Sequence, residues 1–223
     1  MSSTSSAPST ETSRQINLLS LAREQPLIIC DVDEVIVHFI KGLEAFLSQR
    51  DLWLDPASFA LNGNIKTVAD NIVVETAEVG NLLTSFFRYE TKKLQPIAGS
   101  INALQSLAQN AGIVLLSNVP HEAYEDRQAN LSDHGLDFPL ISNKGPKGPA
   151  VQQLIAGHQA PVFFIDDIGH YLTSVYEYCP EVHLIHFMQD KRFSRHAKEL
   201  VHEHYKTDNW RDVEIHVRSI LEP

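Results

Sequence analysis

Short apolar runs alternate with segments of helical periodicity along most of this chain. Runs rich in Val, Ile, Leu and Phe are typical of strands buried on both faces of a sheet, where successive positions can all be apolar. Such runs predict five strands, over residues 26–32, 113–118, 138–142, 161–167 and 182–187.

Between these runs, apolar residues recur at spacings of three and four, which is typical of amphipathic helices. The periodicity predicts helices over residues 38–50, 67–93, 121–133, 150–156 and 171–178, with a further helix beginning near residue 101. Asp208 is a suitable N-cap for a final helix, whose apolar face would include Trp210, Val213 and Val217.

The order of these elements predicts an α/β fold: a Rossmann-like open parallel sheet with helices on both faces. The helical block between the first and second strands is larger than a crossover helix requires, so we predict a mainly helical cap inserted after the first strand. The first residues are rich in Ser and Thr and carry no apolar pattern. We therefore predict a disordered tail over 1–14, an α/β core formed by 15–40 and 95–223, and a helical cap over 41–94.

Composition narrows the functional classes. Of the 223 residues, 18 are Lys or Arg and 28 are Asp or Glu, so the net charge is −10. That balance argues against a nucleic-acid partner, because a nucleic-acid binder needs a basic face. An acidic surface also repels phosphate groups in general, so a phosphate site in this chain would need a cation and nearby lysines.

The chain also lacks the signals of a membrane or secreted protein. No apolar stretch reaches the about 18 residues of a membrane-spanning helix, so we expect no membrane partner. Cys30 and Cys179 are the only cysteines, and their spacing fits neither a metal site nor a disulfide framework. We expect both to be reduced thiols in a cytoplasmic protein. The sequence sets no expectation for the oligomeric state.

Two carboxylates stand at the end of the first strand. Asp31 and Asp33 follow an apolar run with one residue between them. A buried strand should not end on two charges unless they are solvated, paired or bound to a cation. A close pair of carboxylates suits a hard cation such as Mg²⁺, and it also suits a division of roles between a nucleophile and a proton shuttle.

Three other strand ends carry polar residues. In an open parallel sheet, ligands bind beyond the carboxyl ends of the strands. Asp166 and Asp167 follow three large apolar residues, so solvent exposure does not easily account for both carboxylates. The complete set comprises Asp31 with Asp33, Ser117 with Asn118, Lys144 or Lys147, and Asp166 with Asp167.

In type and in order, these residues resemble the four motifs of the haloacid dehalogenase (HAD) superfamily of phosphohydrolases. The sequence Asp31-Val-Asp33-Glu-Val35 resembles the first motif, and Leu-Leu-Ser117-Asn118 resembles the second. Lys147, which precedes a helix, resembles the third motif, and Ile-Asp166-Asp167 the fourth. The resemblance extends from about residue 27 to residue 187 but does not include the inserted block.

The resemblance implies a Mg²⁺-dependent phosphatase that hydrolyses a small phosphomonoester through an aspartyl-phosphate intermediate. Asp31 would be the nucleophile, and Asp33 would protonate the leaving alcohol and then activate water. Ser117, the backbone amide of Asn118 and Lys147 would bind the phosphate.

The same resemblance implies a metal site. Asp31 and Asp166 would bind Mg²⁺ through their carboxylates and Asp33 through its carbonyl oxygen, while Asp167 would support the ion directly or through water. A carboxylate that attacks a phosphate dianion needs such positive charge nearby.

Two features leave alternatives open. Glu34 stands where many phosphatases of the superfamily have glycine, and Lys144 competes with Lys147 because each precedes Gly-Pro. We favour Lys147, because its Gly-Pro leads directly into a helix. The alternative functions are a non-catalytic binding protein with this fold and, less favoured, a haloacid dehalogenase, which would not need Asp33 or the metal-binding acids.

Overall fold

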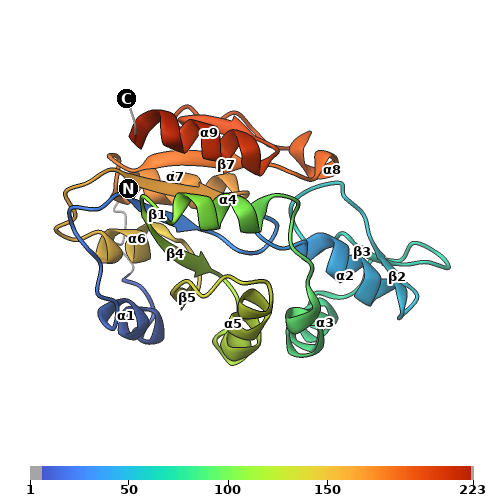
Figure 1. Cartoon of the computed structure of the whole chain (residues 1–223). Coiled ribbons are helices and arrows are strands. Elements are labelled where there is room, and N and C mark those ends of the chain that lie inside the picture. The colour runs from blue at the N-terminus through green and yellow to red at the C-terminus, as the bar shows by residue number, and fades with distance from the viewer. Residues whose placement is uncertain (1–6, 222–223) are drawn as a thin grey trace.

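The computed structural model of the chain describes residues 7–221. At its centre lies a sheet of six parallel strands in the order β5-β4-β1-β6-β7-β8 (Figure 1). The strands are β1 (Leu27–Cys30), β4 (Gly112–Ser117), β5 (Leu140–Ser142), β6 (Val162–Asp166), β7 (His183–Phe187) and β8 (Tyr205–Thr207). All five strands predicted from the apolar runs are present, each within two residues of its expected start and end.

Helices cover both faces of the sheet, as the alternation of side chains along β1 requires. Ile28 and Cys30 belong to a buried cluster that includes residues of α4 (Ser100–Leu107), α5 (Tyr124–Asp133) and α9 (Trp210–Leu221). Leu27 and Ile29 belong to a second cluster with residues of α1 (Thr10–Asn17), α6 (Gly148–Leu154) and α7 (Gly169–Tyr178). This arrangement confirms the predicted fold class.

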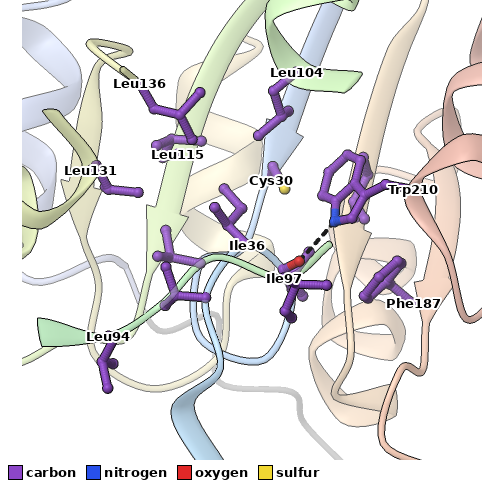
Figure 2. Packing of buried hydrophobic residues seen from close by; sticks show 14 of the residues in the cluster. Cys30, Ile36, Leu94, Ile97, Leu104, Leu115, Leu131, Leu136, Phe187 and Trp210 are labelled. Atoms are coloured by element: carbon purple, nitrogen blue, oxygen red, sulfur yellow. Dashed lines mark hydrogen bonds between the residues drawn. The ribbon is translucent and has the colours of Figure 1, made fainter. Parts of the chain in front are cut away.

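Trp210, at the start of α9, anchors the loop that follows β1. Its indole ring is fully buried and packs against Phe187, with ring centroids 5.6 Å apart (Figure 2). The indole Nε1–H donates a hydrogen bond of 2.9 Å to the carbonyl oxygen of Val35. Trp210 therefore anchors the loop that carries Asp31 and Asp33 to the hydrophobic core.

The segment between β1 and α4 is an insertion, which lies to the right of the sheet in Figure 1. It contains α2 (Phe39–Ser48), β2 (Leu52–Leu54), β3 (Ile65–Thr67), α3 (Thr76–Glu90) and a 3-10 turn, η1 (Thr91–Lys93). The antiparallel pair β2–β3 was not predicted, because strands of three residues are too short to display a period.

The helix predicted over 67–93 begins only at Thr76, so the prediction was wrong for residues 67–75. Thr67 closes a tight turn instead: its Oγ1 accepts the N–H of Ile72 at 2.9 Å, and its own N–H donates to the carbonyl oxygen of Ile72 at 2.9 Å. These local bonds satisfy backbone groups that a helix would otherwise use.

The prediction of a disordered tail over 1–14 was wrong for residues 10–14, which form the start of α1; residues 1–6 lie outside the described residues. Ser9 caps this helix through a hydrogen bond of 3.1 Å from the Thr12 N–H. Thr12 Oγ1 donates to the carbonyl oxygen of Ser142, and the Ser142 N–H donates to Oε1 of Gln15, both at 2.8 Å. Contacts with β5 therefore order a segment whose composition suggested disorder.

The remaining short elements are η2 (His121–Ala123) and α8 (Lys191–Ser194). Strand β8, at the edge of the sheet, was also not predicted, because its three residues, Tyr-Lys-Thr, form no apolar run. Both cysteines are buried free thiols. Within residues 7–221, no helix combines the length and apolar composition that a membrane crossing requires.

Candidate active site

The sheet topology brings the predicted acids together. Strand β1 lies between β4 and β6, so the carboxyl ends of these three strands meet at one edge of the sheet. Asp31 follows β1, Ser117 is the last residue of β4 and Asp166 is the last residue of β6. Residues that are far apart in the sequence are therefore neighbours at this edge.

Lys147 lies between two of these acids. Its Nζ lies 2.7 Å from Oδ1 of Asp31 and 2.7 Å from Oδ2 of Asp166, and its side chain is fully buried. Burial disfavours the ammonium charge, but the carboxylates of Asp166 and Asp31 outweigh this effect and raise the pKa of Lys147. Lys144, the alternative raised by the sequence, is exposed.

Gly148 makes this position of Lys147 possible. The glycine begins α6, where a Cβ would collide with the backbone oxygen of Ser174 in α7. Its N–H donates to Oγ of Ser174 at 3.0 Å. Close packing of the two helices thus directs the preceding lysine into the interior.

Asp31, Asp166 and Asp167 form a group that fits a hard cation. Each offers one carboxylate oxygen, and the three oxygens lie within 4.8 Å of one another. Burial raises the pKa of Asp166 to about 7 even though Lys147 lowers it, and burial also raises the pKa of Asp167 well above its usual range. Binding of a cation requires deprotonated ligands, and three carboxylates against the one ammonium of Lys147 would then leave two negative charges for a divalent cation to balance.

Asp33 has a different partner. Its carboxylate is outside that group of three, and its Oδ1 forms an ion pair with Nη2 of Arg127, a fully buried residue of α5. Burial raises the pKa of Asp33, and the guanidinium of Arg127 opposes that rise. Sequence reasoning missed Arg127, because it lies in a polar helical stretch 94 residues away from Asp33.

Ser117 and Asn118 bridge neighbouring loops. Oγ of Ser117 lies 3.5 Å from Oδ2 of Asp33 and accepts the Val119 N–H at 3.1 Å. In the side chain of Asn118, Nδ2 donates to the Tyr171 hydroxyl at 2.7 Å and Oδ1 accepts from Nδ2 of Asn143 at 2.9 Å. Tyr171 was not singled out in the sequence, because its apolar neighbours in α7 indicate only a helix face.

Glu34 adopts a left-handed backbone conformation with φ of 61°, where glycine is the unstrained choice. Such a conformation costs a larger residue about 1–3 kcal/mol. The Glu34 side chain contributes a hydrogen bond in return, because Oε2 accepts the Ile40 N–H in the first turn of α2 at 2.7 Å. Burial raises the pKa of this carboxyl group to about 7.

A cavity of about 270 Å³ opens beside these residues. Part of its lining is the strand-end wall, which consists of Asp31, Asp33, Asn118 and Asp167. Another part is the apolar wall, which consists of Phe39, Phe59, Leu61 and Phe87 from the segment between β1 and α4 and Met188 and Phe193 from the segment after β7. The acids therefore face a space that a small molecule could enter.

Comparison with known proteins supports the fold and no more. Neither a protein-family model nor a curated protein sequence matches this chain. A HAD-hydrolase from Bacillus subtilis, YfnB, solved bound to magnesium, matches with a TM-score of 0.58 at 14% identity, over 90% of this chain and 100% of that chain. A HAD family hydrolase from Deinococcus radiodurans R1, solved with bound phosphate and sodium, matches with a TM-score of 0.58 at 14% identity, over 89% and 97%.

The chain has the fold of the HAD-like hydrolases. An L-2-haloacid dehalogenase has the same fold, with a TM-score of 0.56 at 11% identity over 87% of this chain and 99% of that one. The resemblance seen in the strand-end residues is thus confirmed at the level of the HAD fold. Because that fold occurs in proteins with different names and ligands, the reaction must be argued from the site.

Proposed function

We propose that this protein is a Mg²⁺-dependent phosphatase that hydrolyses a small phosphomonoester through an aspartyl-phosphate. The observation that carries this proposal is the position of Asp31, which lines the cavity, contacts buried Lys147 and belongs to the group of three acids. A carboxylate in this setting has positive charge close to the point where a phosphate dianion would approach.

In the proposed reaction, an Asp31 oxygen forms a bond to phosphorus while the bond from phosphorus to the alcohol oxygen breaks. Asp33, which also lines the cavity, donates the proton that the leaving alcohol requires. Water then attacks the phosphorus while the bond from phosphorus to the Asp31 oxygen breaks, and Asp33 accepts a proton from that water. Burial raises the pKa of Asp33, and the raised pKa favours the protonated carboxyl group that this step requires. Ser117, the Asn118 backbone amide and Lys147 would bind the phosphate oxygens.

Asp31, Asp166 and Asp167 would hold the metal ion, with the carbonyl oxygen of Asp33 as a further ligand. A bound Mg²⁺ would balance the charges of the carboxylates and phosphate as they approach each other. The fit rests on the three neighbouring carboxylate oxygens and on the charge that Lys147 alone leaves unbalanced.

We further propose that residues 41–94 act as a cap over a core formed by 15–40 and 95–223. Phe59 of this segment packs against Phe193 of the core, with ring centroids 6.0 Å apart, and Glu44 forms an ion pair of 2.6 Å with Arg192. These contacts support a cap that closes one side of the cavity. The free buried thiols support a reducing compartment such as the cytoplasm.

A haloacid dehalogenase and a non-catalytic binding protein are the rival functions. Asp33 and the three-acid group would be superfluous in a dehalogenase, and a binding protein would not require them to face the cavity.

The test is release of phosphate from small phosphomonoesters with Mg²⁺ or with excess EDTA, alongside chloride release from 2-chloropropionate. We expect phosphate release that requires Mg²⁺, and a loss of at least about 1000-fold in kcat for Asp31→Asn, since the nucleophile is removed. Turnover that persists in EDTA contradicts the metal role, and chloride release without metal supports the dehalogenase instead.

A further inference from the structure

The cavity combines one charged wall with one wall that offers almost only hydrocarbon. Beyond the carboxylates at the strand ends, the surface consists largely of four phenylalanines with Leu61 and Met188. Phe39 and Phe87 pack together with ring centroids 5.8 Å apart, and Phe39 also packs edge-on against buried Phe86. The aromatic rings of the insertion therefore support one another and form a preformed surface rather than a set of loose side chains.

Three of the cations near this cavity have acidic partners. The described lining itself contains no Lys, Arg or His. Three cations contact acidic residues of the lining or their neighbours: Lys147 with Asp31 and Asp166, Arg127 with Asp33, and Arg192 with Asp190 and Glu44. A ligand group held against the apolar wall would therefore meet no available positive charge from these three side chains.

The carboxylates Glu34 and Asp190 also belong to the lining, together with Ile40, Ile168, Tyr171 and Gln189. A second phosphate or a carboxylate on the ligand would face these acids in a partly desolvated space, where like charges repel more strongly than in water. The cavity volume of about 270 Å³ is slightly below the usual range for pockets that hold drug-sized ligands, so the cavity suits a group of about one ring beside a phosphate.

We infer that the preferred substrate is a phosphomonoester whose leaving group is apolar, is about as large as one ring and carries no second negative charge. This inference rests on the phosphatase activity proposed above. The phosphate lies toward Lys147 and the acids, and the leaving group lies against the apolar wall. Transfer of an apolar group from water to such a surface is favourable, whereas an anionic group would lose its hydration without gaining a partner.

The test compares kcat/KM for benzyl phosphate, glycerol 3-phosphate and 3-phosphoglycerate with the Mg²⁺-loaded wild-type protein. All three are phosphate esters of primary alcohols, so their intrinsic reactivities are similar. The three esters differ mainly in the polarity and charge of the leaving group. We expect benzyl phosphate to exceed glycerol 3-phosphate by about 10-fold or more and 3-phosphoglycerate to be the poorest of the three.

Substitutions in the apolar wall test whether this wall causes the preference for benzyl phosphate. Phe87→Ala should lower kcat/KM for benzyl phosphate by about 10-fold and leave that for glycerol 3-phosphate nearly unchanged. Phe59→Ala, in a partly exposed loop position, tests the same wall with little risk to folding. Tyr89→Ala is the matched control, because Tyr89 lies on the same helix as Phe87 but is exposed to solvent.

The outcomes separate the two proposals. Turnover that requires Mg²⁺ and Asp31 but favours glycerol 3-phosphate or 3-phosphoglycerate overturns the substrate class and leaves the phosphatase activity intact. An equal loss for all three esters in Phe87→Ala and Phe59→Ala also contradicts the apolar leaving group. Absence of phosphate release from every ester overturns the phosphatase activity, and the substrate class with it.

Discussion

The two walls of the cavity are built on different principles. On the strand-end wall, buried charges are paired: Lys147 lies between Asp31 and Asp166, and Arg127 holds Asp33. The apolar wall has no such pairs and depends on ring packing within the insertion and against Phe193. The contrast indicates that the sheet edge supplies the chemistry and the insertion selects the substrate.

The energetic consequences of substitution should differ accordingly. A buried ion pair adds little net stability, but removing one partner leaves an uncompensated charge at a high cost. Truncating an aromatic ring on a partly exposed wall loses contacts without leaving a buried charge. Changes in the strand-end wall should therefore reduce both stability and turnover, whereas changes in the apolar wall should mainly alter selectivity.

Lys147→Met should give the largest combined effect. The substitution leaves the carboxylates of Asp31 and Asp166 without their buried cation, so the free energy of unfolding should fall by about 3–5 kcal/mol in metal-free buffer. Loss of this charge should also lower kcat by about 100–1000-fold. Urea unfolding and phosphate release measure the two effects. Lys144→Met, an exposed lysine three residues away, is the control and should change neither.

Arg127→Met should have an intermediate effect. It removes the ion-pair partner of Asp33, so we expect a loss of about 1.5–3 kcal/mol in unfolding free energy and of about 100-fold in kcat from a misplaced carboxyl group. The Mg²⁺ concentration that gives half-maximal activity should stay unchanged, because the Asp33 carboxylate is outside the three-acid group. A large shift in that concentration, or a wild-type kcat, would show that Arg127 does not position Asp33. Arg211→Met, an exposed arginine, is the control.

A cluster of histidines outside the cavity lining gives the smallest predicted effect. Nε2 of His183 lies 2.8 Å from Nε2 of His216, and the His204 ring lies 4.4 Å from that of His183. Burial, together with the neighbouring His204 and His216, lowers the pKa of His183 to about 4. Between this value and the usual histidine pKa of about 6.5, the unfolded chain binds more protons than the folded chain, so stability should fall as the pH falls through that range.

Thermal unfolding between pH 4 and pH 7 measures this effect. His183→Gln should flatten the dependence of the melting temperature on pH, because the group with the lowered pKa is gone. His196→Gln, at an exposed position, should leave the slope as in the wild type. An unchanged slope in His183→Gln would assign the acid sensitivity to other groups.

The sequence predicted those features that depend on local pattern. The buried strands appear as continuous apolar runs, and the parallel topology then brings Asp31, Ser117 and Asp166 to one edge. The acids that are unusual after buried strands lie at the edge of the sheet where the carboxyl ends of β1 and β6 meet. Their roles in binding and catalysis stay predictions.

Features that depend on long-range contacts escaped prediction. Arg127 meets Asp33 across 94 residues of sequence, and nothing in the polar stretch around Arg127 distinguishes it from an exposed charge. Helix α1 is ordered by bonds from Thr12 and Gln15 to Ser142, which no local pattern reveals. The short strands β2, β3 and β8 have three residues each, too few to establish a period.

The most direct test of the account is to trap the phosphorylated protein. Wild type would be mixed with a phosphomonoester and Mg²⁺, quenched in acid during turnover, and its peptides analysed by mass spectrometry. We predict a phosphoryl group on Asp31, an adduct that hydroxylamine removes, and no adduct in Asp31→Asn. Steady turnover with no adduct in the wild type, or with the adduct on another residue, would contradict the assignment of Asp31 as the nucleophile.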